Sequence, residues 1–496
     1  MDIITTCENI TLFGGFSMNE FIGRNEELKL LKGLLLKQSS SLVVVYGRRR
    51  IGKSRLIEEF ASQHKFVSFS GLFPEKKTTK QDQLNEFRES FKEQFGKDPG
   101  RLTDWSSAFH QLASYTQKGR IIILLDEITW MGHEDPNFLG KLKNAWDMKL
   151  KKNPRLMLIL CGSVSSWIEK NLLSNRGFYG RISLKLRLQE LPLSDCDQFW
   201  NNQGSNISDY EKFKILSVTG GIPKYLEEIR SDQSAEKNIK RLCFSQHGLL
   251  FNDYQYIFIS LLEHDSRYYR EIVKILGQQP LERNDILKKL SIDSSGVLSN
   301  YLDELTVSGF LQRDYTWNLK SEKTAKLSKY RLSDNYLRFY TKYILPNTEK
   351  IDAGQFSDHS ISSLPAWSSI MGFQIENLVL NNRRQIKSLL GIYPDEVLND
   401  GPFFQRKTDR QRGCQIDYLI QAKFGVLYLC EVKFAFKGIR TNVIAEVQEK
   451  INRLSLPKNF SVKPVLIHVG DVYDEVLGSN YFSKIIDIAE LFHQKR

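Results

Sequence analysis

Eight residues near the start of the chain have the types and the spacing of a phosphate-binding loop. Residues 42–60 read as an apolar strand, the pattern Gly47-x-x-x-x-Gly52-Lys53-Ser54, and a helical pattern. Glycines let backbone N–H groups turn inward around phosphates, and the first turn of the helix adds the positive end of its dipole. The pattern therefore predicts a nucleotide site, whose loop consists of Gly47, Arg48, Arg49, Arg50, Ile51, Gly52, Lys53, Ser54 and Arg55.

Two side chains of this loop have the chemistry to act on a triphosphate. Lys53 is expected to reach the β- and γ-phosphates, and the Ser54 hydroxyl to ligate Mg²⁺. A glycine-rich turn without a ligand is the structural alternative. The strand before the loop and the helix after it favour the nucleotide site.

Acidic and polar residues end two further apolar strands. Residues 120–130 place Asp126 and Glu127 at the end of the first, where α/β proteins form their sites. We expect Asp126 to hold Mg²⁺ through water and Glu127 to orient or deprotonate the attacking water, whereas an isolated Asp-Glu pair could also be a helix N-cap. Residues 156–164 end near Ser163, which could sense the γ-phosphate or only form a turn.

Arg181 opens another predicted strand, in the segment FYGRISLKLRL. Its guanidinium makes it a candidate arginine finger or sensor. An ordinary surface arginine is the alternative, and the residue type alone leaves both interpretations open.

A third set of charged residues lies on a predicted β-hairpin at residues 416–434, IDYLIQAKFGVLYLCEVKF. Asp417 heads the first strand. Glu431 and Lys433 share a face of the second strand, because side chains two apart on a strand point the same way. The turn length brings Asp417 across from Glu431 to within one residue of register.

These hairpin charges could together form a metal and phosphate site. Two neighbouring carboxylates repel, and Mg²⁺ prefers such oxygen ligands together with waters and substrate phosphates, so Asp417 and Glu431 are candidate metal ligands. Lys433 could then position an attacking water or stabilise a pentavalent phosphate. The alternative is an ordinary hairpin, in which Glu431 and Lys433 line a solvated face.

Two helical regions lie between the loop and the hairpin. Residues 187–270 read mostly helical, with Ser and Asp at helix starts. Residues 281–345 give two short helices, a turn and two short strands, which looks like a winged helix-turn-helix. Its second helix holds Asp303 and Glu304, which are poor neighbours for phosphates. The module either binds DNA or packs against the lid and relays nucleotide state, and its predicted wing contains Lys320, Lys323, Lys326, Lys329 and Arg331.

Composition sets wider limits. The 496 residues suggest about three domains, and 41% hydrophobic with 26% charged residues is typical of a soluble globular protein. No apolar run approaches the roughly 18 residues of a membrane span, no secretory signal is evident, and six scattered cysteines indicate a reducing cytoplasm. The net charge of +12 permits a polyanionic partner, and residues 141–190 hold eleven Lys/Arg against three Asp/Glu.

The ordered motifs of residues 18–345 resemble the archaeal-type ATPases of the AAA+/STAND class. The likeness lies in FIGRNEEL (21–28), GRRRIGKS (47–54), LLDEI, CGS and TGGIPKYL (219–226). It implies ATP as the nucleotide, a parallel sheet of order 5-1-4-3-2 and a helical lid. It also implies that Phe21, Ile22 and Gly23 flank the adenine, and that the turn containing Gly221 and Pro223 closes over the nucleotide.

The last domain resembles the PD-(D/E)xK nuclease superfamily, and more closely the restriction-endonuclease-like domain that ends many archaeal-type ATPases of this class. The likeness lies in the order of a helix, Asp417, the Glu431-x-Lys433 hairpin and a second helix. It implies that Glu376 on the first helix assists and that Gln448 on the second completes the site. The chain departs from the family pattern because Ile416, and not a proline, precedes Asp417.

The expected fold is α/β throughout the two catalytic domains. We predict an N-terminal extension at 1–17 (with Met1 or Met18 as the start), a P-loop NTPase core with a parallel sheet at 18–186, and a helical lid at 187–270. A winged helix-turn-helix at 271–345, a connection at 346–368 and a PD-(D/E)xK nuclease-like domain at 369–496 complete the chain.

The expected function is ATP binding and hydrolysis with Mg²⁺ by a cytoplasmic ATPase. It would be coupled to binding of double-stranded DNA and to Mg-dependent cleavage, in defence or mobile-element control, with the nucleotide state repositioning the lid and winged helix. The alternatives are a non-catalytic, ATP-regulated DNA-binding or signalling scaffold, or a transcriptional regulator acting through the winged helix. An oligomer is compatible with this interpretation, and no membrane partner is expected.

Overall fold

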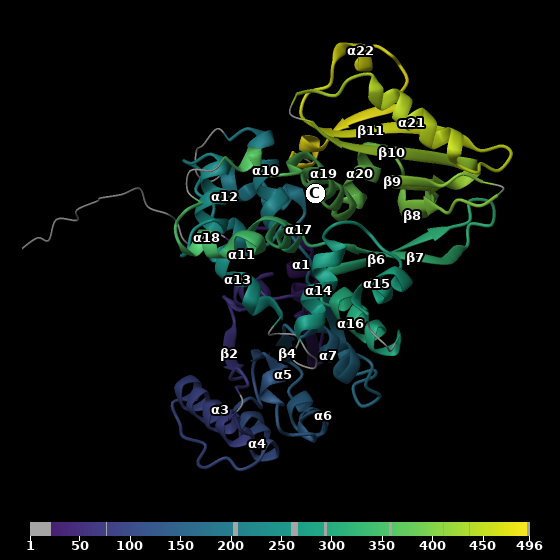
Figure 1. The fold of residues 1–496 in the computed structure, drawn as a ribbon. Helices are drawn as coiled ribbons and strands as arrows, with labels where there is room; N and C mark the ends of the chain where they lie inside the picture. The colour runs from purple at the N-terminus through teal and green to yellow at the C-terminus, as the bar shows by residue number, and fades with distance from the viewer. Residues whose placement is uncertain are drawn as a thin grey trace, which may run out of the picture.

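The computed structural model describes residues 21–75, 77–201, 207–258, 266–291, 295–356, 360–409, 411–435 and 437–493. The predicted N-terminal extension and Met18 lie outside these residues. The two five-stranded sheets lie in separate parts of the molecule, with helices between them (Figure 1).

The first sheet has five parallel strands in the order β2-β3-β4-β1-β5. Every residue of β1 and β4 is buried, as is typical of parallel sheets that are covered on both faces. This order is the one that the resemblance implied, so the prediction is confirmed. The strands are β1 (Ser41–Tyr46), β2 (Lys65–Ser70), β3 (Ile121–Asp126), β4 (Leu156–Gly162) and β5 (Ile182–Arg187).

Helices cover both faces of this sheet. Val43 and Val45 of β1 belong to the apolar cluster that contains Leu31 of α1 and Leu56 of α2, whereas Leu42 and Val44 belong to the cluster on the opposite face. The helices of this domain are α1 (Asn25–Leu34), α2 (Lys53–Ala61), α3 (Lys80–Phe95), α4 (Trp105–Tyr115), α5 (Ile128–Met131), α6 (Phe138–Met148) and α7 (Ser165–Trp167), with a π-helical segment at Ile168–Leu173.

Residues 193–276 are mostly helical where described, as the sequence predicts for 187–270. The helices are α8 (Leu193–Cys196), α9 (Gln198–Asn201), α10 (Asp209–Thr219), α11 (Pro223–Leu226), α12 (Ala235–Cys243), α13 (Leu249–Ile257) and α14 (Ser266–Leu276). The side chain of Ser208 accepts a hydrogen bond from the Glu211 backbone N–H and so caps α10.

Two helices and an antiparallel strand pair follow, in the order that the sequence predicts. They are α15 (Arg283–Leu290), α16 (Ser295–Val307), β6 (Leu311–Trp317) and β7 (Thr324–Leu332), which we call the α15–β7 module. The strand pair packs on the C-terminal sheet, where the indole of Trp317 donates to Gln421 Oε1 at 2.7 Å. Short helices then include α17 (Asn335–Phe339) and α18 (Thr348–Asp352).

The second sheet is mixed, in the order β12-β11-β10-β9-β8. The sequence predicts β9, β10 and β11 but not the edge strands β8 and β12. The elements of this part are α19 (Trp367–Asn381), α20 (Arg383–Leu389), β8 (Val397–Gln405), β9 (Cys414–Ala422), β10 (Val426–Phe434), α21 (Asn442–Arg453), β11 (Ser461–Val469), α22 (Asp474–Leu477) and β12 (Lys484–Asp487). Among the described residues, no helix has the length and apolarity needed to cross a membrane.

Candidate functional sites

Backbone geometry shapes the phosphate-binding loop. Gly47 and Gly52 have φ angles of +149° and +86°, which favour glycine. A Cβ atom on Gly47 would lie 2.6 Å from the carbonyl oxygen of Leu188, so the loop excludes a side chain there. The loop follows β1 and leads into the N-terminus of α2, as the motif requires.

The Lys53 ammonium is buried within the loop. Its Nζ donates to the carbonyl oxygens of Gly47 at 2.9 Å and Arg48 at 3.0 Å. Phosphate oxygens can replace these two acceptors. The position fits the predicted role of Lys53.

Ser54, Asp126 and Glu127 come together at the same sheet edge. The Ser54 hydroxyl donates to Asp126 Oδ2 at 2.8 Å, and this oxygen pair suits Mg²⁺ with waters and phosphates. Glu127 has a φ of +47° and accepts from both the backbone N–H and the hydroxyl of Ser163, at 3.2 and 2.9 Å. Burial raises the pKa of Glu127, while Lys53 opposes this shift.

The predicted adenine and lid residues also lie near the loop. A Cβ on Gly52 would be 3.8 Å from Cγ of Pro223, so the lid turn contacts the loop. Phe21, Ile22 and Gly23 precede Arg24, whose guanidinium donates to the carbonyl oxygen of Ile51 at 3.1 Å. Arg24 had no role in the sequence interpretation. Its place in the FIGR motif is the only signal of it.

Arg181 lies away from this site. It precedes β5, and Leu42, near the start of β1, pairs with Ile182, so Arg181 is at the opposite end of the sheet from the loop. Its guanidinium donates to both carboxylate oxygens of Asp147 on α6, at 2.9–3.1 Å. The prediction that Arg181 senses the nucleotide of its own chain is therefore wrong.

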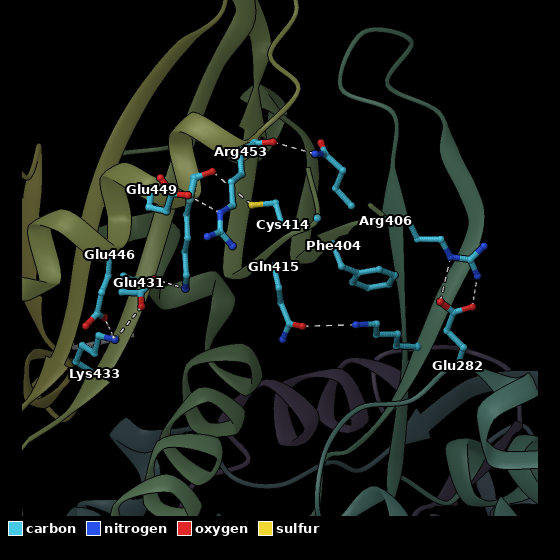
Figure 2. Close-up of a pocket in the computed structure, with 14 residues that line it drawn as sticks. Glu282, Phe404, Arg406, Cys414, Gln415, Glu431, Lys433, Glu446, Glu449 and Arg453 are labelled. Carbon is cyan, nitrogen blue, oxygen red and sulfur yellow. Dashed lines mark hydrogen bonds and ion pairs between the residues drawn. The ribbon is translucent and has the colours of Figure 1, made fainter. Parts of the chain in front are cut away.

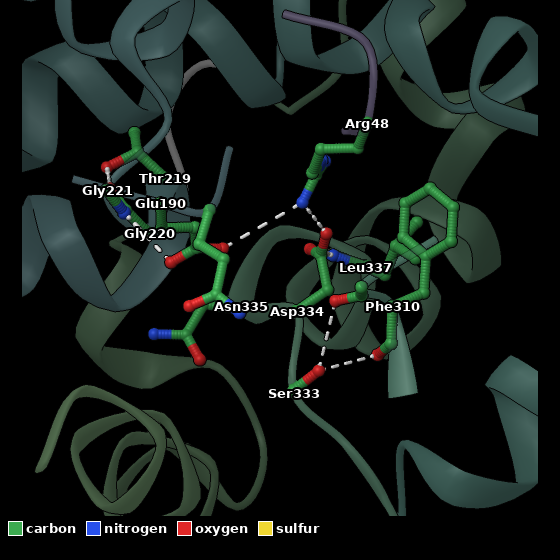
Figure 3. A network of polar contacts seen from close by, with 12 residues as sticks. Arg48, Glu190, Thr219, Gly220, Gly221, Phe310, Ser333, Asp334, Asn335 and Leu337 are labelled. Atoms are coloured by element: carbon green, nitrogen blue, oxygen red, sulfur yellow. Dashed lines mark hydrogen bonds and ion pairs between the residues drawn. The ribbon is translucent and has the colours of Figure 1, made fainter. Parts of the chain in front are cut away.

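The arginines of the loop join it to later parts of the chain (Figure 3). Arg48 forms a buried ion pair with Asp334, lies 3.8 Å from Glu190, and stacks over the ring of Phe310. Arg50 pairs with Asp253 of α13 at 2.6 Å. The motif does not specify the residues at these two positions, so sequence reasoning could not assign their partners.

The hairpin places its carboxylates side by side. Cys430 pairs with Tyr418 in the antiparallel register, so Glu431 and Asp417 follow as the next opposed pair. The register prediction is confirmed. The backbone N–H of Val432 donates to Asp417 Oδ2 at 3.1 Å, and Lys433 Nζ lies 3.0 Å from Glu431 Oε1.

Lys450 of α21 completes this cluster. Its ammonium lies 2.5 Å from Glu431 Oε2 and 3.4 Å from Asp417 Oδ1. The predicted residue, Gln448, points elsewhere, because its amide donates to Asn452 and accepts from Tyr481. That prediction is wrong. On a helix, Lys450 shares a face with Glu446, four residues earlier, whereas Gln448 does not.

Glu376 of α19 lies near the same carboxylates. Burial, followed by the charge of Asp417, raises the pKa of Glu376 to about 8. Burial and the charge of Glu431 likewise raise the pKa of Asp417. The implied neighbourhood of Glu376 and Asp417 is therefore present, and as an anion Asp417 is repelled by Glu431 and itself repels Glu376.

Comparison with known proteins assigns the first domain. Residues 21–229 match the family described as "ATPase domain predominantly from Archaea". These residues are an archaeal-type ATPase domain. The chain is thus an ATPase, and its nucleotide loop is the P-loop of that domain.

Relatives and solved structures extend over more of the chain. An uncharacterised protein of Methanocaldococcus jannaschii is 27% identical over 363 residues, which is 72% of this chain and 76% of the relative. An uncharacterised ATP-binding protein of the same organism is 40% identical over 45 residues, 9% of this chain and 76% of the relative. A Walker-type ATPase of Pyrococcus abyssi has a TM-score of 0.48 at 17% identity, covering 65% of this chain and 96% of that structure.

A cleft of about 740 Å³ lies between the α15–β7 module and the cluster of Asp417, Glu431, Lys433 and Lys450, which we call the C-terminal cluster (Figure 2). Glu282 and Lys329 line one side, and Glu431, Lys433 and Lys450 line the other. Lys329 Nζ donates across it to Gln415 Oε1 at 3.5 Å. A ligand in this cleft would contact both parts of the protein.

The carboxylates of this cluster fit a small oxygen-liganded cation. Asp417 and Glu431 supply two neighbouring carboxylates, and Mg²⁺ is commonly held by one or two carboxylates with waters and phosphates. The described residues contain no group of three or more His, Cys, Asp or Glu side chains arranged to hold a metal. A metal here would therefore depend on waters and substrate for its remaining ligands.

Proposed function

We propose that this ATPase, which we place in the AAA+/STAND class, uses its nucleotide state to control a DNA-cleaving site in the C-terminal domain. The observation that carries the proposal is the cluster of Asp417, Glu431 and Lys433, together with Lys450, at a cleft shared with the α15–β7 module. Acids and ammonium groups at such spacing are suited to phosphodiester hydrolysis.

ATP hydrolysis in this proposal follows from the P-loop site. Lys53 would neutralise charge on the β- and γ-phosphates, and Ser54 with Asp126 would hold Mg²⁺. Glu127 orients the attacking water, while its two hydrogen bonds from Ser163 fix the direction of its carboxylate. Bound ATP phosphates would therefore change the contacts of both Lys53 and Glu127.

In the C-terminal cluster, Asp417 and Glu431 would hold Mg²⁺, which would polarise the scissile phosphate and lower the pKa of its bound water. Lys433 forms ion pairs with Glu431 and Glu446. Burial lowers the pKa of Lys433, but these two acids raise it by more, so Lys433 stays a cation beside the phosphate. Lys450 supplies a second ammonium. A substrate phosphate would compete with the carboxylates for both.

The P-loop has a direct path toward this cluster. Lys53 donates to the carbonyl oxygen of Arg48, and the Arg48 guanidinium pairs with Asp334. Asp334 also accepts from the Leu337 backbone N–H at 2.8 Å, which caps α17. When phosphates withdraw Lys53 from the Arg48 carbonyl, the position of Arg48 and the start of α17 are expected to change.

The next residue, Asn335, connects that segment to α19. Asn335 Nδ2 donates to the Gln374 carbonyl at 3.2 Å, and Gln374 Nε2 donates back to the Asn335 carbonyl at 2.7 Å. Asn377 Nδ2 donates to Asn335 Oδ1 at 3.0 Å. Glu376 lies between Gln374 and Asn377 on the same helix, so motion of α17 is expected to reach Glu376, whose carboxyl group interacts with the charge of Asp417.

The α15–β7 module acts in this proposal mainly as the relay. The exposed part of α16 carries Asn300 and Asp303 and no basic residue among those described. Arg187 of β5 donates to the carbonyl oxygens of Thr306 and Val307, which fixes the end of α16 to the ATPase domain. Arg331, predicted as a wing cation, is instead buried against Asp314.

A nuclease assay tests the proposal. Wild-type protein and Glu431→Ala are incubated with linear duplex DNA and Mg²⁺ or Mn²⁺, with and without ATP. We expect cleavage by the wild type that depends on ATP and falls at least ~100-fold in the variant, since Glu431 touches both lysines. Glu475→Ala, a change at an exposed acid of α22, is the matched control. Equal cleavage by Glu431→Ala and wild type contradicts the proposal.

A second candidate function is a non-cleaving, ATP-regulated DNA-binding or signalling scaffold, including a transcriptional regulator. The Lys450 ammonium favours it, because it already bridges Asp417 and Glu431 where a cation would lie. Salt-dependent DNA binding without cleavage in the same assay would support this function over the first.

A further inference from the structure

Ten basic and no acidic residues occupy the segments that lead into the five strands of the ATPase sheet, which are residues 35–40, 62–65, 116–120, 149–155 and 174–181. Because the strands are parallel, these segments meet at one edge of the sheet, opposite the P-loop. Six exposed residues of the first four segments form what we call the basic edge: Lys37, Lys65, Lys118, Arg120, Lys152 and Arg155.

Strand register aligns these cations in a row. Lys65 pairs with Ile121, and Ile121 pairs with Leu156, so Arg120 and Arg155 each come one residue before the same pair. Neighbouring strands lie about 4.8 Å apart. Like charges placed on adjacent strands destabilise the fold by themselves, so the row is unfavourable without an anion.

Acids of the chain leave this row largely unneutralised. Asp147, at the end of α6, is already engaged by Arg181, Lys143 and Lys151 at 2.9, 3.2 and 3.3 Å. The ends of α2 and α3 add only Glu58, Glu59 and Glu93. Among the described residues, no hydrogen bond or ion pair involves the charged group of Lys118, Lys152 or Arg155, and the Arg155 backbone N–H donates to Asn153 Oδ1 at 3.0 Å.

We propose that the basic edge binds the phosphate backbone of double-stranded DNA. Four adjacent strands give a row of cations roughly 15 Å long, which follows several phosphates, and its arginines can pair with phosphate oxygens in two-point contacts. The cations lie at or just before strand starts, whereas binding to a membrane surface typically uses an amphipathic helix. The choice of DNA among polyanions rests on the proposed function of the C-terminal cluster.

The position of the edge separates it from both other sites. The P-loop lies at the opposite end of the same sheet, and the cleft is lined by the α15–β7 module and the C-terminal domain. DNA on the edge therefore does not compete with ATP for its site. The ATPase domain itself becomes a DNA-contacting part of the protein.

DNA binding by the full-length protein tests the proposal. The variant Lys118→Gln/Lys152→Gln/Arg155→Gln removes three cations that have no described intrachain side-chain partner. Binding of a fluorescent 30-base-pair duplex is measured by anisotropy at several NaCl concentrations. We expect at least a tenfold loss of affinity, and a fall of roughly 2 to 3 in the slope of log affinity against log salt, at ~0.9 per phosphate contact.

The matched control is Lys423→Gln/Lys458→Gln/Lys463→Gln, which removes the same charge from exposed positions of the C-terminal domain. It should bind within about twofold of wild type, and both variants should keep wild-type basal ATPase rates. If the edge variant binds DNA like the control, the edge proposal is wrong.

Two further measurements separate this proposal from the proposed function. An Arg406→Gln variant removes a cation from the cleft and leaves the basic edge unchanged. If DNA affinity falls in this variant but not in the edge variant, the edge proposal is wrong and the nuclease proposal stands. A wild-type protein that binds no duplex at low salt contradicts both. A third outcome also overturns the proposal: the wild type binds anionic phosphatidylserine vesicles but no DNA, and the edge variant does not bind the vesicles. The basic edge would then be a membrane-binding surface.

Discussion

At the scale of single residues, the P-loop lysine is the group on which we expect nucleotide affinity to depend most. Lys53→Ala removes the P-loop ammonium that is expected to reach the β- and γ-phosphates, so ATP binding should be lost, which isothermal titration or a fluorescent ATP analogue can measure. Arg181→Ala is the informative control, because Arg181 pairs with Asp147 at the far end of the sheet. If Lys53→Ala kept wild-type affinity for ATP, the P-loop assignment would be wrong.

Glu376 gives the protein a distinct pH dependence. Its pKa rises from 4.5 to about 8 on folding, so between those values the folded state holds a proton that the unfolded state has lost. The free energy of unfolding should therefore fall as pH rises across this window, by roughly a few kcal/mol at most. Glu376→Gln keeps the shape of the side chain and removes this loss.

Thermal melts at pH 6 and pH 8.5 measure the effect. The wild type should lose several degrees of Tm more than Glu376→Gln between the two pH values. Glu475→Gln, at an exposed glutamate, should follow the wild type. Parallel behaviour of all three proteins would show that Glu376 is ionised throughout.

At the scale of elements, α17 depends on an ion pair that begins in the P-loop. Asp334→Asn keeps an oxygen that can accept from the Leu337 backbone N–H, but it removes the charge that pairs with buried Arg48. Breaking a buried ion pair costs roughly 3–5 kcal/mol. We expect a clear fall in Tm together with a changed affinity for ATP.

Differential scanning fluorimetry with and without ATP measures both consequences. The exposed-site control is Asp471→Asn, which should leave Tm and nucleotide affinity unchanged. A stable Asp334→Asn protein with wild-type ATP affinity would show that the ion pair contributes neither to stability nor to coupling.

Local patterns predicted the strands and loops that carry chemistry, because their signals are contiguous in the sequence. The P-loop, the end of β3 and the register of Asp417 with Glu431 are of this kind. For Arg181 the residue type left a nucleotide-sensing and a surface role open, and its position before β5, at the end of the sheet opposite the P-loop, favours the surface role. Lys450 was missed because the choice between it and Gln448 depends on the rotation of α21 about its axis.

Partners distant in the sequence could not be predicted at all. Arg48 and Asp334 are 286 residues apart, and neither residue type nor spacing links them. The same holds for Trp317 and Gln421, whose hydrogen bond fixes the β6–β7 pair to the C-terminal sheet. The Trp317–Gln421 hydrogen bond joins the α15–β7 module to the C-terminal sheet, and the Arg48–Asp334 pair joins the P-loop to the segment that follows β7.

At the scale of the whole molecule, the P-loop and the C-terminal cluster lie at the two ends of one chain of buried contacts. Arg48, Asp334, Asn335 and α19 form it, and each contact is within the protein interior. If this chain transmits nucleotide state, the effect must be reciprocal: DNA must change ATP affinity by the same factor that ATP changes DNA affinity.

Asn377→Ala tests whether α19 carries this coupling, because Asn377 donates from α19 to Asn335 and touches neither site. For the wild type we expect the Kd of a non-hydrolysable ATP analogue to shift roughly 5- to 100-fold on adding duplex DNA, with an equal shift in the converse titration. In Asn377→Ala both ligands should still bind, but each Kd should become independent of the other ligand. Asn144→Ala, at an exposed position of α6, controls for the substitution and should keep the wild-type coupling. A change that only destabilised the protein would weaken binding of each ligand but would still leave each Kd dependent on the other ligand. Wild-type coupling in Asn377→Ala would show that α19 does not carry the signal.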